Sequence, residues 1–258
     1  MRDSFTYCAY VSLVGRLART HALVRFAELK NDAPAPPYVI LRHDVDYSPR
    51  AALQMATLEA EAGWRATYFL LPNGPYYNLL SPENAGFPRC LVELGHEVGL
   101  HYDVRLFSAF PRPRWDAILD AQAQLLAALS GERVSSIAMH QPALRGEDPF
   151  ALRPDLVNAY DPRFVRETTY ISDSCRAWRD ASWRALFEEG PLPDRLQLSL
   201  HPVNWAERDR SRSEIFAGAR REVLQSIEAS HADLMEKVSV HAAVKEHEAR
   251  TARRGDAG

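Results

Sequence analysis

The chain has 258 residues, a formal net charge of -3 and 25% charged residues, which are the values of an ordinary globular protein. This length suits one large α/β domain, so we expect residues 1–258 to form a single domain. Without an excess of basic residues there is no electrostatic attraction to nucleic acid, and no nucleic-acid partner is expected. Nothing in the sequence indicates an oligomeric state.

The cysteines and the lengths of the apolar runs indicate in which cellular compartment the protein is expected. Cys8, Cys90 and Cys175 have no C-x-x-C spacing, which argues against a disulfide framework and against a thiolate zinc site. No apolar run reaches the length of a membrane span, and no signal peptide is recognisable. We therefore expect a cytoplasmic protein without a membrane span.

Residues 1–37 are expected to form a helical extension followed by a linker. Apolar residues recur at mostly helical spacing between positions 5 and 29, which predicts one or two helices. A proline-rich stretch from Asn31 to Pro37 ends them and leads into the first strand of the main fold.

Residues 38–205 alternate between apolar strands and helices, as in the βα units of a parallel sheet or barrel. The predicted strands cover residues 38–46, 64–71, 96–103, 134–139, 165–172 and 196–200. The predicted helices cover residues 49–62, 88–94 and 115–129. The pattern between residues 144 and 158 is too weak for a prediction. A long amphipathic helix is expected over residues 213–250, with His231, His241 and His247 on its surface.

Five predicted strands end in side chains that can bind a metal or transfer a proton. These side chains are Asp44 and Asp46, His101 and Asp103, His140, Asp173, and His201. The carboxyl ends of parallel strands lie on one face, where ligands bind in α/β folds, so we expect these groups to converge. A mixed carboxylate and imidazole set suits zinc, cobalt, nickel, manganese or iron better than calcium or magnesium. We expect a divalent transition metal as cofactor, with zinc first.

The two aspartates of the first strand are the starting point. Asp44 and Asp46 lie two residues apart, so in an extended chain their side chains point the same way and could share a metal ion or a water molecule. Taken alone, the segment could equally be a strand end with an Asx turn before Ser48-Pro49. The later strand ends decide in favour of a site.

Five motifs, in this order, resemble the polysaccharide deacetylase family, the NodB homology domain of carbohydrate esterase family 4. They are Leu41-Arg42-His43-Asp44-Val45-Asp46, Ala66-Thr67-Tyr68-Phe69, Gly95-His96-Glu97-Val98-Gly99-Leu100-His101, Tyr170-Ile171-Ser172-Asp173-Ser174 and Leu198-Ser199-Leu200-His201-Pro202. The resemblance covers residues 38–205. It implies a distorted (β/α) barrel with fewer than eight strands, and a metal-dependent hydrolase that removes acyl groups from amino sugars.

The resemblance also implies the roles of four residues. Asp44 falls on the catalytic aspartate of the family and Asp46 on its metal-binding aspartate. His101 falls on the first metal histidine. His201 falls on the histidine that protonates the departing amine.

The third metal ligand departs from the family pattern. The position of the second metal histidine is occupied by Arg105, which cannot be a ligand. Either His140 or Asp103 could complete the set. We favour His140, because it ends a neighbouring strand, whereas Asp103 can be explained as a helix cap.

The remaining candidates concern the substrate. We expect Arg42, Tyr102, Asp173 and Trp178 to contact it, and Arg42 is also a candidate for the arginine that steadies the catalytic carboxylate in the family. The expected substrate is a small molecule or glycan with an N-acyl group, first an N-acetyl amino sugar or a sugar-containing precursor in polysaccharide or glycoconjugate biosynthesis. Two alternatives remain open: a hydrolase of another C–N amide bond, such as a deformylase or amidohydrolase, and a metal-free carbohydrate-binding protein that has lost catalysis.

Overall fold

A computed structural model describes residues 4–30, 34–72, 74–142, 148–150, 153–178, 186 and 191–255, the last nine of them by backbone only. The chain divides into two compact units, Met1–Ile215 and Phe216–Gly258, and each is described by itself. The single domain expected from the length stays a prediction.

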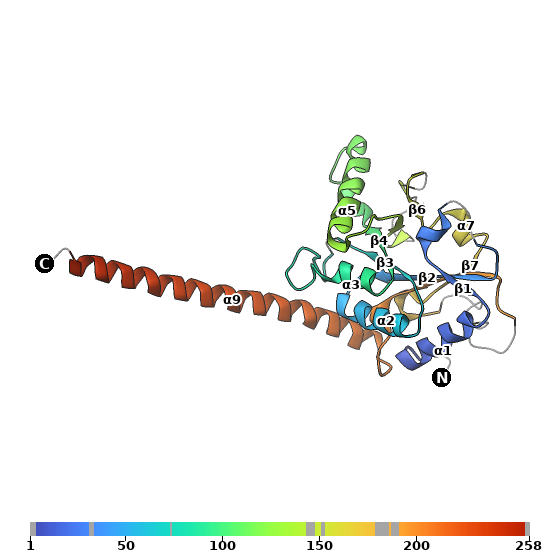
Figure 1. The fold of residues 1–258 in the computed structure, drawn as a ribbon, viewed down its shortest axis with the longest axis horizontal. Coiled ribbons are helices and arrows are strands. Elements are labelled where there is room, and N and C mark those ends of the chain that lie inside the picture. Colours follow the sequence, from blue (N-terminus) through green and yellow to red (C-terminus); the bar gives the residue numbers. More distant parts are fainter. Residues whose placement is uncertain are drawn as a thin grey trace. The chain divides into compact units, whose positions relative to one another are not determined.

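The first unit is built on an eight-stranded sheet (Figure 1). Its strands are β1 (Ala22–Val24), β2 (Tyr38–Val45), β3 (Thr67–Leu70), β4 (Glu97–Tyr102), β5 (Ser136–Met139), β6 (Val157–Asn158), β7 (Thr169–Ser172) and β8 (Arg195–Leu200). Seven of them lie in the order β6-β5-β4-β3-β2-β8-β7, β1 pairs with β2 outside this order, and every pair is parallel. The predicted fold class, a distorted (β/α) barrel, is confirmed. The expectation of fewer than eight strands is wrong, because the sheet has eight strands when the short strands β1 and β6 are included.

Strand β2 is the centre of this sheet. On one side it pairs with β8 along residues 38–43. On the other side its first part pairs with β1 and its last part, residues 42–45, pairs with β3. Because all eight of its residues are buried, both faces of β2 contact the rest of the protein.

The helices mostly follow the predicted ranges. They are α1 (Tyr7–Ala18), α2 (Pro49–Glu61), α3 (Phe87–Glu93), α4 (Val104–Phe107), α5 (Trp115–Ser130), α7 (Pro162–Val165) and α9 (Arg212–Gly255), with 3-10 turns η1 (Phe26–Leu29), η2 (Arg112–Arg114), η3 (Ser174–Arg176) and η5 (Pro202–Asn204). The Ser48 hydroxyl caps α2 by accepting the Ala51 N–H at 3.2 Å, as its sequence predicts. Gly131 ends α5 in the left-handed conformation, with φ of 83°.

Two predicted regions differ from the structure. Residues 5–29 hold helix α1 and the 3-10 turn η1, in line with the one or two helices predicted, but residues 22–24 form strand β1 against β2, which was not predicted. The strand predicted over 165–172 begins only at Thr169, since Asp161 caps the short helix α7 by accepting the Arg163 N–H.

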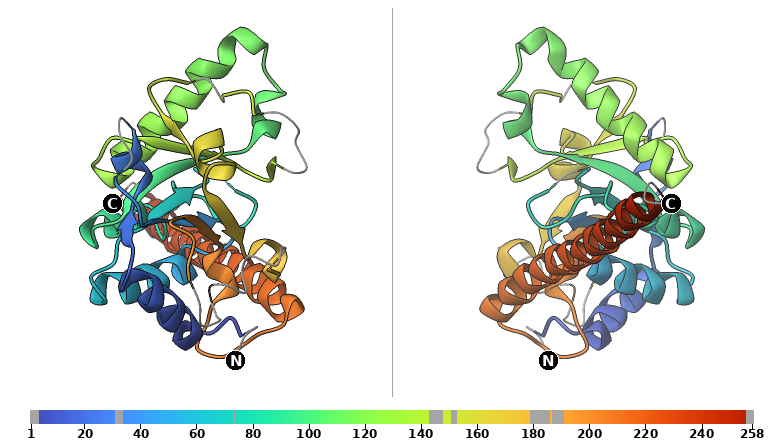
Figure 2. Two further views of the ribbon diagram at one scale, coloured as in Figure 1. Left: turned by 90° about the vertical axis from the view of Figure 1, so that its right-hand side faces the viewer. Right: turned by 90° about the vertical axis from the view of Figure 1, so that its left-hand side faces the viewer.

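The core occupies both faces of the sheet. Val39 and Leu41 of β2 belong to the larger apolar cluster, together with residues of α1, α2, α3 and α5. Helices α1 and α2, dark and light blue in Figure 2, lie on the same side of the sheet. Ile40 belongs to a smaller cluster on the other face, with Phe26 and Phe69. Since side chains alternate along a strand, Arg42 and Asp44 share the face of this smaller cluster.

The second unit consists of the C-terminal part of helix α9. Three apolar residues of the predicted stripe on this helix, Ile227, Leu234 and Val238, are between 53% and 60% exposed. His231 and His241 are exposed, as expected, and His247 lies outside the residues whose side chains are described. Among the described residues, no helix combines the length and the apolar character that crossing a membrane requires.

Candidate active site

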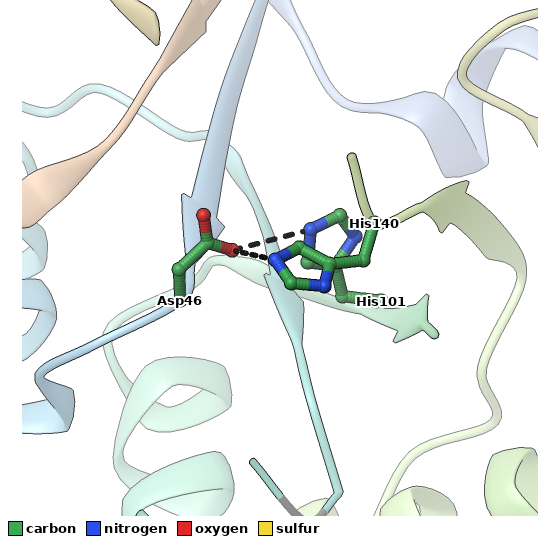
Figure 3. Close-up of side chains that lie close together, drawn as sticks. All are labelled: Asp46, His101 and His140. Carbon is green, nitrogen blue, oxygen red and sulfur yellow. Dashed lines mark ion pairs between the residues drawn. The ribbon is translucent and has the colours of Figure 1, made fainter. Parts of the chain in front are cut away.

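Three side chains from neighbouring strands converge beyond the carboxyl end of the sheet. Asp46 follows β2, His101 lies in β4, and His140 follows β5. The Asp46 Oδ1 atom lies 3.3 Å from His101 Nε2 and 3.8 Å from His140 Nε2 (Figure 3). One ligand atom of each residue lies within 4.8 Å of the others. This arrangement is what a small three-ligand metal site requires.

The two histidine rings are oriented by their other nitrogen atoms. His101 Nδ1 lies 2.9 Å from the Ala138 carbonyl oxygen, to which only an N–H can donate. His140 Nδ1 lies 3.3 Å from Asp103 Oδ2. With the proton on Nδ1 in both rings, each Nε2 keeps its lone pair and faces Asp46. Metal-binding histidines are commonly held in this way by a carbonyl or carboxylate group.

The surroundings of Asp103 explain its position beside the site. Its carboxylate accepts the backbone N–H of Arg105 at 3.0 Å and also binds the Arg105 guanidinium. These hydrogen bonds outweigh the effect of burial and lower the pKa of Asp103 to about 2. Asp103 therefore caps α4 and faces His140 Nδ1, while His140 Nε2 faces Asp46. That His140 is the third metal ligand stays a prediction.

A buried oxygen of Asp46 supports a cation at this point. Among the described residues, the Asp46 Oδ1 atom lies near His101 Nε2 and His140 Nε2 but accepts no hydrogen bond of normal geometry. Burial by itself raises the pKa of this carboxyl group, but the nearby His101, His201 and His140 rings outweigh it, and the net shift is downward. Burial and the neighbouring His101 lower the pKa of His140, so its ring is neutral at neutral pH. A charged carboxylate and a neutral imidazole are the forms that bind a metal, so the residues fit a divalent transition metal.

Asp44 lies on the same face of β2 and is held by an arginine of its own strand. Arg42 donates from Nε to Oδ1 at 2.8 Å and from Nη2 to Oδ2 at 2.9 Å. Gln197 and Tyr160 also bind the guanidinium, at 3.2 and 2.8 Å. Burial raises the pKa of Asp44, but the charge of Arg42 outweighs it and the net shift is downward. Asp44 is thus a fixed, ionised carboxylate two residues before Asp46.

His201 approaches the centre from β8. Its Nε2 lies 3.7 Å from Asp46 Oδ2, and its Nδ1 lies 2.7 Å from Asp173 Oδ1. Asp173 is itself held by the indole N–H of Trp205 at 2.9 Å and by the backbone N–H of His201. Burial lowers the pKa of His201, but the hydrogen bond and charge of Asp173 outweigh it and raise the pKa to about 9. The ring is therefore protonated at neutral pH.

The four residues expected to contact substrate are in contact with other side chains of the protein. Arg42 and Asp173 are 0% exposed and hold Asp44 and His201, respectively. Tyr102 is also 0% exposed and donates to the Asp148 carboxylate. Trp178 stacks on the Phe5 ring at 5.6 Å between centroids. The three fully buried residues thus support other side chains, and a direct contact of any of the four residues with substrate stays a prediction.

Two residues of this site were not found from the sequence. Tyr160 and Gln197 bind Arg42 from outside any recognised motif. Gln197 could have been found from the sequence. It is a polar residue in the middle of a strand predicted to be buried, and a buried amide requires a hydrogen-bond partner. Tyr160 lies just after the stretch without a clear pattern, so no signal marked it.

No family model matches the sequence, and no curated protein matches it either. Solved structures do match. The Xyl-CE4 domain of a multidomain xylanase from the hindgut metagenome of Trinervitermes trinervoides is 15% identical, with 74% of this chain and 83% of that chain covered and a TM-score of 0.43. A mutant of the peptidoglycan deacetylase PdaC from Bacillus subtilis is 14% identical, with 77% and 96% covered and a TM-score of 0.45. A family 4 carbohydrate esterase pseudoenzyme from Bacillus anthracis is 14% identical, with 76% and 63% covered and a TM-score of 0.43.

Proposed function

We propose that the protein is a metal-dependent hydrolase that removes an N-acyl group, first of all N-acetyl, from an amino sugar. The observation that carries the proposal is the convergence of Asp46, His101 and His140 within 4.8 Å. Asp44 lies two residues before this set and His201 lies 3.7 Å from it. A metal set flanked by a carboxylate base and an imidazolium acid is the arrangement that amide hydrolysis needs.

Asp46, His101 and His140 would hold the metal, and zinc is the first candidate among the transition metals that accept mixed carboxylate and imidazole ligands. When bound, such a metal polarises the acyl oxygen and makes water more acidic. Arg105 does not argue against binding, because His140 supplies a third ligand where Arg105 cannot.

Asp44 takes the proton of the attacking water in this proposal. Its pKa is low, so it is ionised at neutral pH, and the two hydrogen bonds from Arg42 keep its oxygens in place. Arg42 therefore acts as a positioning residue. His201 gives a proton to the departing amine. With a pKa of about 9 it carries that proton at neutral pH, and Asp173 keeps its Nε2 turned towards the centre.

The substrate class in this proposal is a small molecule or glycan in polysaccharide or glycoconjugate biosynthesis. This part rests on the motifs that resemble polysaccharide deacetylases. A cytoplasmic location is supported by Cys8, Cys90 and Cys175, which form no disulfide among the described residues, since reduced cysteines persist in reducing compartments.

The test measures metal and acetate together. Purified protein is expected to contain about one equivalent of a transition metal per chain and to release acetate from N-acetylated chitooligosaccharides, and both are lost after chelation and restored by zinc. Asp46→Ala is expected to lose both properties. Asp116→Ala, which removes a carboxylate that is 65% exposed on α5, is the matched control and is expected to keep both. Full acetate release by metal-free protein would contradict the mechanism.

A further inference from the structure

Two tyrosine rings meet at the edge of the candidate active site. Tyr47 directly follows the metal-ligand candidate Asp46, and its ring centroid lies 4.7 Å from that of Tyr76, with 60° between the ring planes. Both side chains are partly exposed. We call these two rings the aromatic wall.

The neighbours of Tyr47 place the aromatic wall beside the metal-ligand candidates. In the chain, Tyr47 directly follows Asp46 just beyond the end of β2, so the Cα atoms of the two residues are about 3.8 Å apart. In space, its ring meets the Tyr76 ring at 4.7 Å between centroids. The aromatic wall therefore begins at the end of β2 from which Asp46 extends.

The position of Tyr76 is fixed by the buried residue that follows it. Tyr77 is 7% exposed, donates to the Val45 carbonyl oxygen at 2.6 Å and accepts the Leu71 N–H at 3.0 Å. The loop closes on itself because Gly74 N–H donates to the Tyr77 carbonyl oxygen. The ends of β2 and β3 thus anchor the loop, and Tyr76 is held against Tyr47.

A rigid pair of partly exposed aromatic rings beside a reactive centre is suited to the apolar face of a sugar. Aromatic rings provide a large contact area, and tyrosine adds a polar edge for the hydroxyl groups. Binding pockets generally combine such surfaces with a few polar groups. We infer that the aromatic wall receives the pyranose ring of the substrate and gives specificity for a cyclic amino sugar over an acyclic acyl compound.

This inference rests on the proposed function, and the experiment separates the two. Acetate release is measured from di-N-acetylchitobiose and from vinyl acetate, an activated ester without a ring. Tyr47→Ala and Tyr76→Ala are each expected to raise KM for the sugar by about tenfold, with kcat changed less than threefold and vinyl acetate hydrolysis unchanged. Tyr47→Phe keeps the ring and is expected to keep KM within about threefold of the unchanged protein.

Tyr7→Ala is the matched control, since Tyr7 is a partly exposed tyrosine of α1 that binds Gln54, and its KM is expected to stay unchanged. Calorimetric titration of di-N-acetylchitobiose into zinc-loaded Asp44→Asn protein, with and without Tyr47→Ala, measures sugar binding independently of turnover.

Three outcomes would count against one of the two proposals. If Tyr47→Ala has the same KM and the same sugar affinity as the protein with Tyr47, the inference alone is overturned. Sugar binding that depends on Tyr47, without hydrolysis of either compound, overturns the proposed function and leaves the inference standing. Hydrolysis of vinyl acetate without binding or hydrolysis of the sugar overturns the inference.

Discussion

At the scale of single residues, the proposed site departs from the family motif at its second metal histidine. In the proposal His140 takes the role of that histidine, and Asp103 orients His140. Arg105 stands where a metal histidine is expected, and its guanidinium binds Asp103 instead. Asp103 in turn faces His140 Nδ1 at 3.3 Å. In the proposed site the third ligand therefore comes from the next strand, and a carboxylate two residues before Arg105 orients it.

The first prediction concerns this carboxylate. Asp103→Ala is expected to weaken zinc binding by about 10 to 100-fold, the usual cost of removing a group that orients a ligand, whereas His140→Ala removes a ligand and abolishes binding. Competition with a chromophoric chelator measures both. Asp161→Ala is a matched control, because Asp161 also caps a one-turn helix and binds an arginine two residues later. Equal zinc affinity in the Asp103 and Asp161 variants would show that Asp103 is only a helix cap.

The second prediction concerns Asp44. Asp44→Asn is expected to retain zinc, because Asp44 is not among the three ligand candidates, and to lower kcat by about 10² to 10⁴-fold through loss of the base. His201→Ala is expected to lower kcat for amides in a similar way but to affect activated esters less, since their leaving groups need no proton. Steady-state rates with metal content measured on the same samples check this. A kcat near that of the unchanged protein in Asp44→Asn would make Asp44 a structural residue.

The residues that could be predicted are those at strand ends. Asp44, Asp46, His101, His140 and His201 each follow or end an apolar run, and parallel strands bring such positions to one edge. The partners of these residues were harder to predict. Whether Arg42 contacts substrate or Asp44 depends on the direction of one side chain, and an i,i+2 pair on a strand is visible in sequence only as spacing.

At the scale of elements, one face of strand β4 holds both a buried hydrogen-bonding residue, Glu97, and a metal-ligand candidate, His101. Glu97, Gly99 and His101 alternate along it and so point to the same side. Gly99 leaves room there, because a Cβ atom would lie 2.5 Å from the Phe69 ring and 2.8 Å from Ser136 Oγ. Glu97 at the start of the strand accepts hydrogen bonds from Ser136 Oγ, Thr67 Oγ1 and the Ala27 N–H. These hydrogen bonds join β4 to β3, β5 and the N-terminal segment.

The third prediction is a pH dependence of stability from Glu97. Burial raises the pKa of this carboxyl group above its usual value, against the opposing effect of its hydrogen bonds. A carboxyl with a raised pKa in the folded state stabilises the fold below its unfolded pKa of about 4.3, and this contribution is lost as pH rises through the folded-state pKa. The unfolding free energy of Glu97→Gln, relative to unchanged protein, is therefore expected to increase between pH 4 and 7.

Urea unfolding at several pH values measures this difference. Glu93→Gln is the matched control, because Glu93 is 61% exposed and pairs only with Arg89 on α3 among the contacts described. Its relative stability is expected to stay constant with pH. A relative stability of Glu97→Gln that falls with pH would mean that the hydrogen bonds of Glu97 favour its ionised form.

The elements themselves were predictable where a pattern was long enough to show its period. Strand β2 and helix α5 have eight and sixteen residues, enough for a run or a helical repeat to appear. Strand β1 has three residues and β6 has two, which is too short for an alternating pattern to repeat. Both exist because a neighbouring strand supplies hydrogen bonds, and pairing of this kind is a tertiary effect that a local pattern does not contain.

At the scale of the whole molecule, every residue of the candidate site belongs to the unit Met1–Ile215. The same is true of both apolar clusters, whose buried members end at Trp205. The fold and the site are thus properties of one compact unit with its own core. Metal binding and stability should therefore be linked within this unit, since a ligand that binds only the folded state stabilises it.

The last prediction tests this link. At a free zinc concentration of about 100 times Kd, binding adds about 2.7 kcal/mol to the free energy of unfolding, and the midpoint of thermal unfolding is expected to rise accordingly. A chain that ends at Ile215 is expected to show the same rise as the full chain, because it keeps Asp46, His101 and His140. Asp46→Ala is expected to show none in either length. Calorimetry with zinc and with chelator measures the midpoints, and a rise that requires residues 216–258 would mean that the C-terminal unit takes part in metal binding.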